Sequence, residues 1–496
     1  MNRLTGLETE YGIHVEGRGP RDWIRETVSL VGACPFPSVR CWNYRSEQPR
    51  RDMRGFTAQF LASDPVDAQF DIGASPGAGE TRCDRCLENG ARFYNDHGHP
   101  EYATPECRSL RDLVAHDAAG ERIVLASARA LSQASGRKVT IYKNNTDFHG
   151  ASYGTHESYL MQRSVPVQTL ISAMLPFLAT RQIYAGSGKV GSEIRERGGV
   201  GFQISQRADF LQVAASVDTL HNRPIFNTRD EPHASIAQYR RLHVICGDAN
   251  MAQHSTALKV GATQLVVELL ERGWSPKLEL VDPVRAAHSV SRDLTLKETV
   301  ECCDGSPRTA IEVQRIYLDA AQQLQLDDAD AVWACAAWRD ALDGLADEPE
   351  GMADRIDWVA KYRLLDTFRE AEGLKWSDAT MQSLDLAYHD LDPDVGLFHG
   401  LDAAGLMRNT VTPDQVEMAM RQAPADTRAA IRALFIRRFP GSVRSMGWGG
   451  ILFNHGDQEL ALSLEPLVEA NVAILNKELE AAGSVQEIID ALAKTA

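Results

Sequence analysis

The sequence lacks an apolar run long enough to cross a bilayer. Its most apolar long segment, residues 165–179, is short and contains Ser172 and Pro176, whereas a spanning helix needs about 20 predominantly apolar residues. No apolar stretch follows the first residues either, where Glu8 and Glu10 already stand. The sequence therefore predicts neither a signal peptide nor a membrane anchor, and we expect a cytoplasmic protein.

Cysteines are few, and basic residues are outnumbered by acidic ones. Nine cysteines in 496 residues, an odd number, are typical of thiols kept reduced in a cytoplasm. The net charge of -16 argues against nucleic acid or an anionic membrane as the main partner. One local basic segment runs from Arg40 to Arg54, and it is either the rim of a basic groove or a solvated loop.

Strand and helix patterns are mixed rather than strictly alternating, which favours an α+β fold with an antiparallel sheet. Strands are expected at residues 1–15, 90–97, 138–144 and 238–247. Helices are expected at residues 107–133, 165–182 and 251–272, the last ending at Gly273, and through most of residues 308–375.

Two further boundaries follow from composition. Residues 44–90 are rich in Arg, Asp, Gly, Ser and Pro and are expected to form a long mobile loop. After Pro424 we expect a smaller unit of helices with one or two strands. The chain would then divide into a large domain, residues 1–423, and a small C-terminal domain, residues 424–496.

Three of the expected strands carry polar side chains at alternate positions, so that these side chains share a face. They are Glu8 with Glu10, Arg92 with Tyr94 and Asp96, and Arg241 with His243. A solvated acidic edge strand is the alternative for the first pair taken alone. Together the three strands favour a concave polar face that holds Mg²⁺ and phosphate, because oxygen ligands suit a hard cation and Arg suits phosphate.

The segment from Tyr94 to Tyr102 concentrates carboxylates, imidazoles and phenols. Packing gives no reason for so many titratable groups, so chemistry is the favoured explanation. Taken alone, Asp96-His97-Gly98-His99 is also typical of a zinc-dependent amidohydrolase with His97 and His99 as ligands.

Three weaker motifs remain. Cys83 and Cys86 form half a zinc site, and with Cys34 and Cys41 they flank one loop, so the alternatives are a structural Zn²⁺ site and unconnected thiols. The stretch 186–191 matches G-x-G-x-x-G, but a helix precedes it, so we interpret it as a flexible Gly-rich turn. Trp448, flanked by glycines, either covers a nucleotide base or packs the C-terminal unit.

Longer strings resemble the Pup ligase and depupylase family of the bacterial pupylation system, which is related in fold to glutamine synthetase. The resemblance covers nearly the whole chain. The matching segments are residues 6–12, 89–94, 96–106, 142–145, 152–159, 205–207, 227–234, 239–250, 357–358 and 384–386, together with Trp448.

Two features resemble the depupylase branch more than the ligase branch. One is the long loop entered through residues 42–44 and 51–56, and the other is the spacing from Asp96 to His99-Pro100-Glu101. Two features depart from the pattern: residues 209–215 are less acidic, and the C-x-x-C is unusual, which leaves open whether the modifier is Pup itself or a Pup-like protein.

The resemblance implies a large glutamine synthetase-like domain with a curved antiparallel sheet that packs on helices. It also implies ATP, or ADP with phosphate, and Mg²⁺ as cofactors. The implied Mg²⁺ ligands are Glu8, Glu10, Tyr94, Glu101, His156 and His243. The implied nucleotide contacts are Arg92, Thr104, Arg229, Arg241 and Trp448, and Asp96 is the implied catalytic residue.

The resemblance also implies a reaction and partners. Cleavage of the isopeptide bond between a Pup-like modifier and a substrate lysine is expected, with deamidation of the modifier's C-terminal Gln as a further activity. Asp96 would attack the amide or activate water. A Pup ligase and an inactive Pup-binding scaffold are the alternatives. The partners would be Pup and pupylated proteins, in a pathway linked to a bacterial proteasome.

Overall fold

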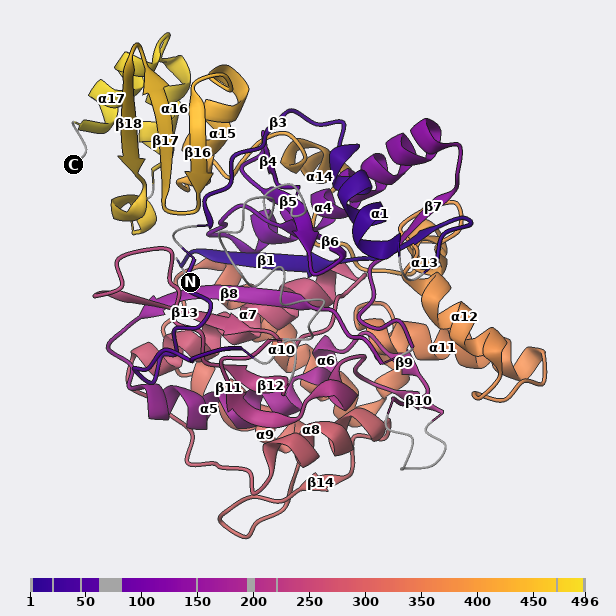
Figure 1. The fold of residues 1–496 in the computed structure, drawn as a ribbon. Helices are drawn as coiled ribbons and strands as arrows, with labels where there is room; N and C mark the ends of the chain where they lie inside the picture. The colour runs from indigo at the N-terminus through magenta and orange to yellow at the C-terminus, as the bar shows by residue number, and fades with distance from the viewer. Residues whose placement is uncertain are drawn as a thin grey trace.

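A seven-stranded sheet, in which all neighbouring strands are antiparallel, forms the centre of the protein (Figure 1). The structure is a computed structural model that describes residues 3–19, 22–44, 47–61, 83–148, 150–193, 201–219, 222–469 and 472–493. The strand order is β13-β8-β1-β6-β5-β4-β3. This confirms the α+β class and the antiparallel sheet.

The strands of the central sheet are β1 (Thr5–Glu10), β3 (Ser38–Val39), β4 (Arg85–Leu87), β5 (Arg92–Asp96), β6 (His99–Ala103), β8 (Thr155–Gln162) and β13 (Tyr239–Val244). The two-stranded ladders pair β2 (Gly12–Val15) with β7 (Val139–Tyr142), β9 (Lys189–Val190) with β10 (Phe202–Gln203), β11 (Val213–Ser216) with β12 (Pro224–Asn227), and β14 (Thr299–Val300) with β15 (Arg308–Thr309).

The first helices along the chain are α1 (Trp23–Gly32), α4 (Leu110–Ser135), α5 (Val167–Thr180), α6 (Gln182–Ala185), α7 (Gln253–Glu271), α8 (Pro283–Arg292), α9 (Ala310–Ala321) and α10 (Ala329–Asp347). They are followed by α11 (Asp357–Ala371), α12 (Ala379–Tyr388), α13 (Leu397–Ala403), α14 (Pro413–Ala419), α15 (Ala429–Arg438), α16 (Ala473–Ala481) and α17 (Val485–Ala493). None of the helices in the described ranges is both long and apolar enough to span a membrane.

Alternation along the strands gives the central sheet one apolar face and one polar face. Leu7, Tyr159 and Leu242 point into the main core, where α4 and α7 pack on β1 and β8. Local signals fix these helices: Ser109 caps α4 by accepting a hydrogen bond from the Asp112 amide, and Gly273 adopts the left-handed conformation just after α7.

The expected loop at residues 44–90 is partly ordered strand. Residues 85–87 form β4, which pairs with β5 and β3. A strand of three residues is too short to show an alternating pattern in the sequence. Pairing with β3 and β5 stabilises β4 instead. Asp52 is buried and accepts hydrogen bonds from Thr228 and from the Arg54 guanidinium. Residues 45–46 and 62–82 of this expected loop lie outside the described residues.

The C-terminal unit contains three strands rather than the one or two expected. These are β16 (Val443–Gly447), β17 (Gly450–His455) and β18 (Gln458–Ser463), an antiparallel sheet packed with α15, α16 and α17 (upper left in Figure 1). Glycines and charged residues interrupt the apolar pattern of these strands, so the pattern predicts too few strands. Val39 and Cys86 of the central sheet join the same core, and the division at residue 424 stays a prediction.

Glu106 connects the large body to α15. Its carboxylate accepts a hydrogen bond from Arg428 at 2.8 Å and pairs with the buried Arg432. Burial raises the pKa of Glu106, but the charges of Arg432 and Arg428 outweigh that effect and lower the pKa to about 2. Removing one partner of such a buried network leaves uncompensated charge.

We expect Glu106→Gln to lower the free energy of unfolding by about 3 kcal/mol, because it leaves two buried guanidinium groups without their carboxylate. Urea denaturation at pH 7 measures this. The stabilisation by Glu106 is complete above the ordinary pKa of 4.5 and is lost as the pH falls towards 2. Wild type should therefore lose stability more steeply than the variant over that range.

The matched control is Glu480→Gln, which removes a more exposed partner of Arg437 and should cost less than about 1 kcal/mol. Equal losses in the two variants would contradict a special role for Glu106.

Candidate functional site

The register of the central sheet brings acidic and histidine side chains together on the polar face. Glu8 of β1 lies opposite His156 of β8, and Glu10 lies opposite Glu101 of β6. Tyr94 of β5 lies opposite Glu101 on its other side. Side chains from neighbouring strands therefore form a continuous polar row across the sheet.

The first group in this row is Glu8, His156 and His243, whose ligand atoms all lie within 4.8 Å of one another. Burial raises the pKa of Glu8, but its hydrogen bond with His156 and the charge of Arg241 outweigh burial and lower the pKa to about 2. Burial and the neighbouring Arg241 lower the pKa of His243 well below its usual value. One ionised carboxylate and a neutral imidazole are therefore ready to bind a cation.

The second group consists of Glu10, Asp96 and Glu101, again with ligand atoms within 4.8 Å of one another. Burial and the charges of Asp96 and Glu8 raise the pKa of Glu101 well above its usual value. One oxygen of Glu101 is buried without a hydrogen-bond partner. Three carboxylates at this distance repel one another unless a cation lies between them, so the group fits a hard divalent cation such as Mg²⁺.

All six residues expected to hold Mg²⁺ lie on this face, and five of them fall into the two groups, whereas Tyr94 belongs to neither. Asp96 belongs to the second group, which the sequence did not predict. Tyr94 lies against Glu101 and hydrogen-bonds with it. Alternation shows that side chains share a face, whereas the separation into two groups depends on the stagger between strands.

A tight hairpin turn fixes the position of Asp96. His97 and Gly98 connect β5 to β6 with φ values of 46° and 92°, as in a type I′ turn. A Cβ at Gly98 would lie 3.0 Å from the ring of Trp23. His97 Nδ1 lies 2.9 Å from Asp96 Oδ2, and the Asp96 side chain is 32% exposed. A short turn therefore holds Asp96 at the exposed edge of the second group of carboxylates.

The structure separates the two histidines that resemble a zinc motif. His97 pairs with Asp96, whereas His99 stacks on Tyr153 at 4.4 Å and meets the edge of Trp23. Neither belongs to a metal-ligand group among the described residues. The amidohydrolase interpretation based on His97 and His99 is therefore wrong, because His97 lies in the turn and His99 in β6, so the two rings have different neighbours.

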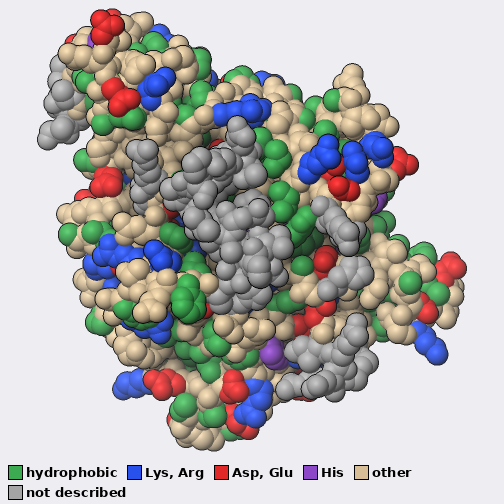
Figure 2. Space-filling model, in the orientation of Figure 1, with side chains coloured by type: hydrophobic (Ala, Val, Ile, Leu, Met, Phe, Trp, Pro, Cys, Tyr) green, Lys and Arg blue, Asp and Glu red, His purple; other side chains and the backbone are tan. Residues whose placement is uncertain are grey.

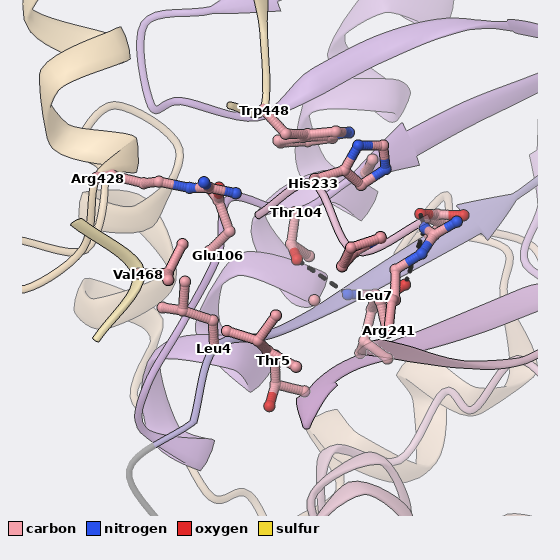
Figure 3. A pocket seen from close by; sticks show the side chains of 16 residues that line it. Leu4, Thr5, Leu7, Thr104, Glu106, His233, Arg241, Arg428, Trp448 and Val468 are labelled. Carbon is pink, nitrogen blue, oxygen red and sulfur yellow. Dashed lines mark hydrogen bonds and ion pairs between the residues drawn. The ribbon is translucent and has the colours of Figure 1, made fainter. Parts of the chain in front are cut away.

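An open pocket adjoins the first metal group (Figure 3). Glu8, Thr104, Arg241 and Trp448 line it together with apolar residues such as Val468. Figure 3 shows Arg428 and Arg241 on opposite sides, with Trp448 between them at the top of the view. An aromatic ring, apolar walls and cations beside a metal site suit a nucleotide.

Two of the five expected nucleotide residues do not line this pocket. The guanidinium of Arg92 lies 3.7 Å from the ring centre of Tyr94 and 4.2 Å from that of Trp42, and it pairs with Asp84. It supports Trp42, which in turn meets Trp448 edge to face at 5.0 Å. Arg229 lies outside the pocket, and its Nε is buried without a hydrogen-bond partner.

Sequence reasoning assigned no role to His233, Glu106, Arg428 or Arg207. The first three line the pocket. Burial lowers the pKa of Arg207, although the charge of Glu10 opposes this shift, and the Arg207 Nε has no hydrogen-bond partner. His233 adopts φ of 50°, a conformation uncommon outside glycine. Only the family resemblance, whose matching segments include Arg207 and His233, could have predicted a role for these two residues, because no motif spacing in the sequence does so.

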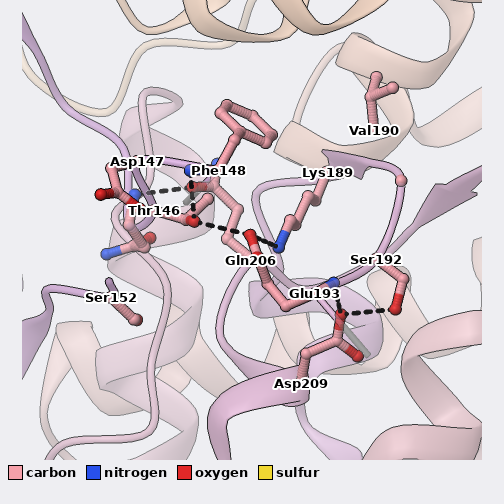
Figure 4. A network of polar contacts seen from close by, with 12 residues as sticks. Thr146, Asp147, Phe148, Ser152, Lys189, Val190, Ser192, Glu193, Gln206 and Asp209 are labelled. Atoms are coloured by element: carbon pink, nitrogen blue, oxygen red, sulfur yellow. Dashed lines mark hydrogen bonds and ion pairs between the residues drawn. The ribbon is translucent and has the colours of Figure 1, made fainter. Parts of the chain in front are cut away.

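The stretch 186–191 is not a flexible turn. Lys189 is 1% exposed and pairs with Glu193, which also accepts a hydrogen bond from Thr146, while Asp209 accepts one from Ser192 (Figure 4). The glycines are needed for backbone shape, since Gly188 has φ of 73°. The interpretation as a flexible turn is wrong because a local motif does not show the buried polar partners that distant segments supply.

The four thiols around residues 34–86 do not form a zinc site. Cys34 and Cys83 pack in one hydrophobic cluster, whereas Cys41 and Cys86 pack in the cluster of the C-terminal unit. No three of these described thiols come within metal-binding reach of one another. Residue 34 precedes the short strand β3 and residue 41 follows it, so the two thiols pack in different hydrophobic clusters.

Comparison with known proteins identifies the family. The model of the family described as Pup-ligase protein matches residues 3–452. The chain belongs to the Pup-ligase family. It is 41% identical to the Pup deamidase/depupylase of Mycobacterium tuberculosis, with 99% of each chain covered.

Two further relatives show both names within the family. The chain is 40% identical to the depupylase of Acidothermus cellulolyticus, covering 99% of each chain. It is 42% identical to the Pup--protein ligase of Acidimicrobium ferrooxidans, covering 94% of this chain and 95% of the relative.

Solved structures of the Pup-ligase family agree with the fold described above. The ligase PafA in complex with Pup superposes with a TM-score of 0.77 at 30% identity, covering 99% of this chain and 95% of PafA. PafA in complex with ADP gives a TM-score of 0.73 at 31% identity, covering 89% of this chain and all of that one.

We expect Mg²⁺ to raise the thermal unfolding midpoint of this protein, because a cation that binds only the folded state stabilises it by about 2.7 kcal/mol at 100 times its Kd. Glu101→Gln should reduce this increase to the share that the first group contributes, since it removes a carboxylate from the second group. Differential scanning fluorimetry with and without EDTA measures both effects.

The matched control is Glu193→Gln, which removes a carboxylate from the Lys189 network and from neither metal group. It should keep the full Mg²⁺ response. A Glu101→Gln protein that responds like wild type would contradict cation binding at the second group.

Proposed function

We propose that this protein is a depupylase, which hydrolyses the isopeptide bond between a Pup-like modifier and a substrate lysine with ATP and Mg²⁺ as cofactors. Deamidation of the modifier's C-terminal Gln is a further activity of the same kind. The observation that carries the proposal is the position of Asp96. Its side chain is the exposed member of the second group, which consists of three carboxylates. The relatives named depupylase at about 40% identity support it.

The described residues fit the two implied cofactors. Glu8, His156 and His243 would hold one Mg²⁺, and Glu10 with Glu101 a second. When bound, these ions would neutralise charge on phosphate groups. Arg241 and Arg229 each keep a buried Nε without a hydrogen-bond partner, as expected of donors meant for an anion that is not part of the protein.

The base of the nucleotide would occupy the pocket beside Trp448 and Thr104. An aromatic ring stacks on any base, which contributes about 1–3 kcal/mol. The structure of a relative in complex with ADP supports the assignment. Trp448 comes from the C-terminal unit, so we propose that this unit, taken from residue 424, completes the nucleotide site.

Asp96 would act on the amide carbon of the isopeptide bond, as nucleophile or as the base that removes a proton from water. Amides resist hydrolysis, so the developing oxyanion also needs stabilisation. His97 would orient the carboxylate, since its Nδ1 lies 2.9 Å from Asp96 Oδ2. As the base, Asp96 would take a proton from water and pass it to the lysine amine as the amide bond breaks. As the nucleophile, Asp96 would form an anhydride with the modifier's carboxyl group, the lysine amine would take its proton from water, and a second water would hydrolyse the anhydride.

The modifier would bind along the face that Figure 2 shows. Lys and Arg side chains gather on the left of this face, over β13, although the net charge of the chain is -16. Pup-like modifiers are acidic and disordered and would bind through charge and apolar contacts. Arg40, Arg50 and Arg54 are exposed candidates for the rim. We propose that the protein acts in the cytoplasm on pupylated proteins, in a pathway linked to a bacterial proteasome.

A Pup ligase is the second candidate, favoured by the 42% identity to a Pup--protein ligase and by the fold of PafA. In a ligase Asp96 would accept a proton from the incoming lysine amine.

Incubation with a pupylated protein, with and without ATP and Mg²⁺, tests the function directly. We expect free substrate and intact modifier, detected by mass, only when nucleotide is present, without one ATP consumed per bond. Formation of new conjugates from free modifier, with stoichiometric ATP hydrolysis, would instead identify a ligase.

In the same assay Asp96→Asn should reduce cleavage by at least about a hundredfold, the lower range for a positioned acid or base. It should keep ADP binding, because Asp96 does not line the pocket. Asp394→Asn, an exposed carboxylate on another part of the surface, is the control and should leave the rate unchanged. Full activity of Asp96→Asn would remove Asp96 from the mechanism.

Trp448→Ala should weaken ADP binding about tenfold or more, because stacking on a base contributes about 1–3 kcal/mol. Isothermal titration calorimetry with Mg²⁺ present measures the change. Trp376→Ala, a similarly half-buried tryptophan that packs on Tyr362 and Phe202, is the control. Equal affinities for all three proteins would place the base elsewhere.

A further inference from the structure

Segment 38–43 joins the two sheets of the protein. Residues 38 and 39 form β3 and pair with β4 of the central sheet. A few residues on, the amide of Met446 in β16 donates to the carbonyl of Cys41 at 2.8 Å, and Trp42 pairs with Met446 as a parallel bridge. This short segment therefore belongs to the central sheet at one end and to the C-terminal sheet at the other.

Two thiols meet at this junction. Val39 pairs with Cys86 of β4, and Cys41 lies two residues further along the same face, diagonal to Cys86. The two thiols act on each other's pKa and pack in the same hydrophobic cluster. Cys34 and Cys83 lie in the other cluster. Of the four thiols around the loop, one pair is thus set apart at the boundary between two sheets.

The two thiols differ in chemistry. Cys41 is half-buried, and its hydrogen bond with Cys86 lowers the pKa of the Cys41 thiol below its usual value. Cys86 is 2% exposed, and the same contact together with burial raises its pKa well above the usual value. An accessible thiol with a lowered pKa beside a resolving partner is the arrangement found in redox-sensing cysteines.

The pair is connected to the nucleotide pocket through a series of side-chain contacts. Cys86 is the strand partner of Arg92, whose guanidinium covers the ring of Trp42, and Trp42 meets Trp448 at 5.0 Å. Trp448 and Val468, both from the C-terminal unit, form part of the pocket wall. A bond that fixes Cys41 to β4 would therefore restrain the segment on which Trp42 and Trp448 meet.

We propose that Cys41 and Cys86 form a peroxide-sensitive dithiol whose disulfide fixes segment 38–43 and slows nucleotide exchange. The Cys41 thiolate attacks a peroxide, so that an S–O bond forms, the O–O bond breaks and an alcohol or water leaves. Cys86 then attacks the Cys41 sulfur, an S–S bond forms and water leaves. The peroxide gains the two electrons that the two thiols lose. Disulfides in reducing compartments are usually transient and regulatory in this way.

The effect on nucleotide rests on the proposed function, whereas the disulfide does not, so the test reads them separately. The full chain is treated with hydrogen peroxide in a Cys303→Ser background, because Cys303 is exposed and would cross-link molecules. Peptide mapping without reductant should show one Cys41–Cys86 linked peptide, and the intact mass should fall by that of two hydrogen atoms. Dithiothreitol should restore both thiols.

Stopped-flow displacement of a fluorescent ADP analogue gives the second readout. ADP should dissociate severalfold more slowly from the oxidised protein, while Cys41→Ser and Cys86→Ser proteins should not respond to peroxide. The matched control, Cys34→Ser with Cys83→Ser, should respond like wild type. Absence of the linked peptide, or its formation with another cysteine, would overturn the dithiol. A formed disulfide with unchanged ADP dissociation would overturn the control of exchange.

Discussion

The main physical constraint on the site is the electrostatic repulsion among four carboxylates on one face of the central sheet. Glu8, Glu10, Asp96 and Glu101 lie on three neighbouring strands. Oxygens of Glu10, Asp96 and Glu101 lie within 4.8 Å of one another, whereas Glu8 groups with two histidines. Burial and these neighbours raise the pKa of Glu101 well above its usual value. An apolar face with helices behind it fixes the strands, so the carboxylates cannot move apart. Divalent cations are the physical means of relieving this repulsion.

The nucleotide pocket depends on a second constraint, the attachment of the C-terminal unit. Glu106 binds Arg432 of α15 and Arg428, which directly precedes that helix, and segment 38–43 pairs with both sheets. These contacts place Trp448 over residues from the first strands of the chain. Chain ends more than 400 residues apart therefore build one pocket, and the stability of the junction determines whether the pocket exists.

Much of this could be predicted from the sequence where the signal is local and periodic. Alternation along β1, β5 and β13 marked the polar face, and the family resemblance supplied Trp448 and Thr104. What failed depends on contacts between distant segments. The stagger of strands divided the metal ligands into two groups, and a packed arginine, Arg92, supports the pocket without lining it. Cys34 and Cys41 lie close in sequence but in different cores.

The central claim is that the polar face of the sheet holds two divalent cations. Crystals grown with Mn²⁺ and ADP, measured at the manganese absorption edge, test it most directly. The account predicts two anomalous peaks, one among Glu8, His156 and His243 and one among Glu10, Asp96 and Glu101. A map with no peak on this face of the sheet, at full occupancy of ADP, would contradict it.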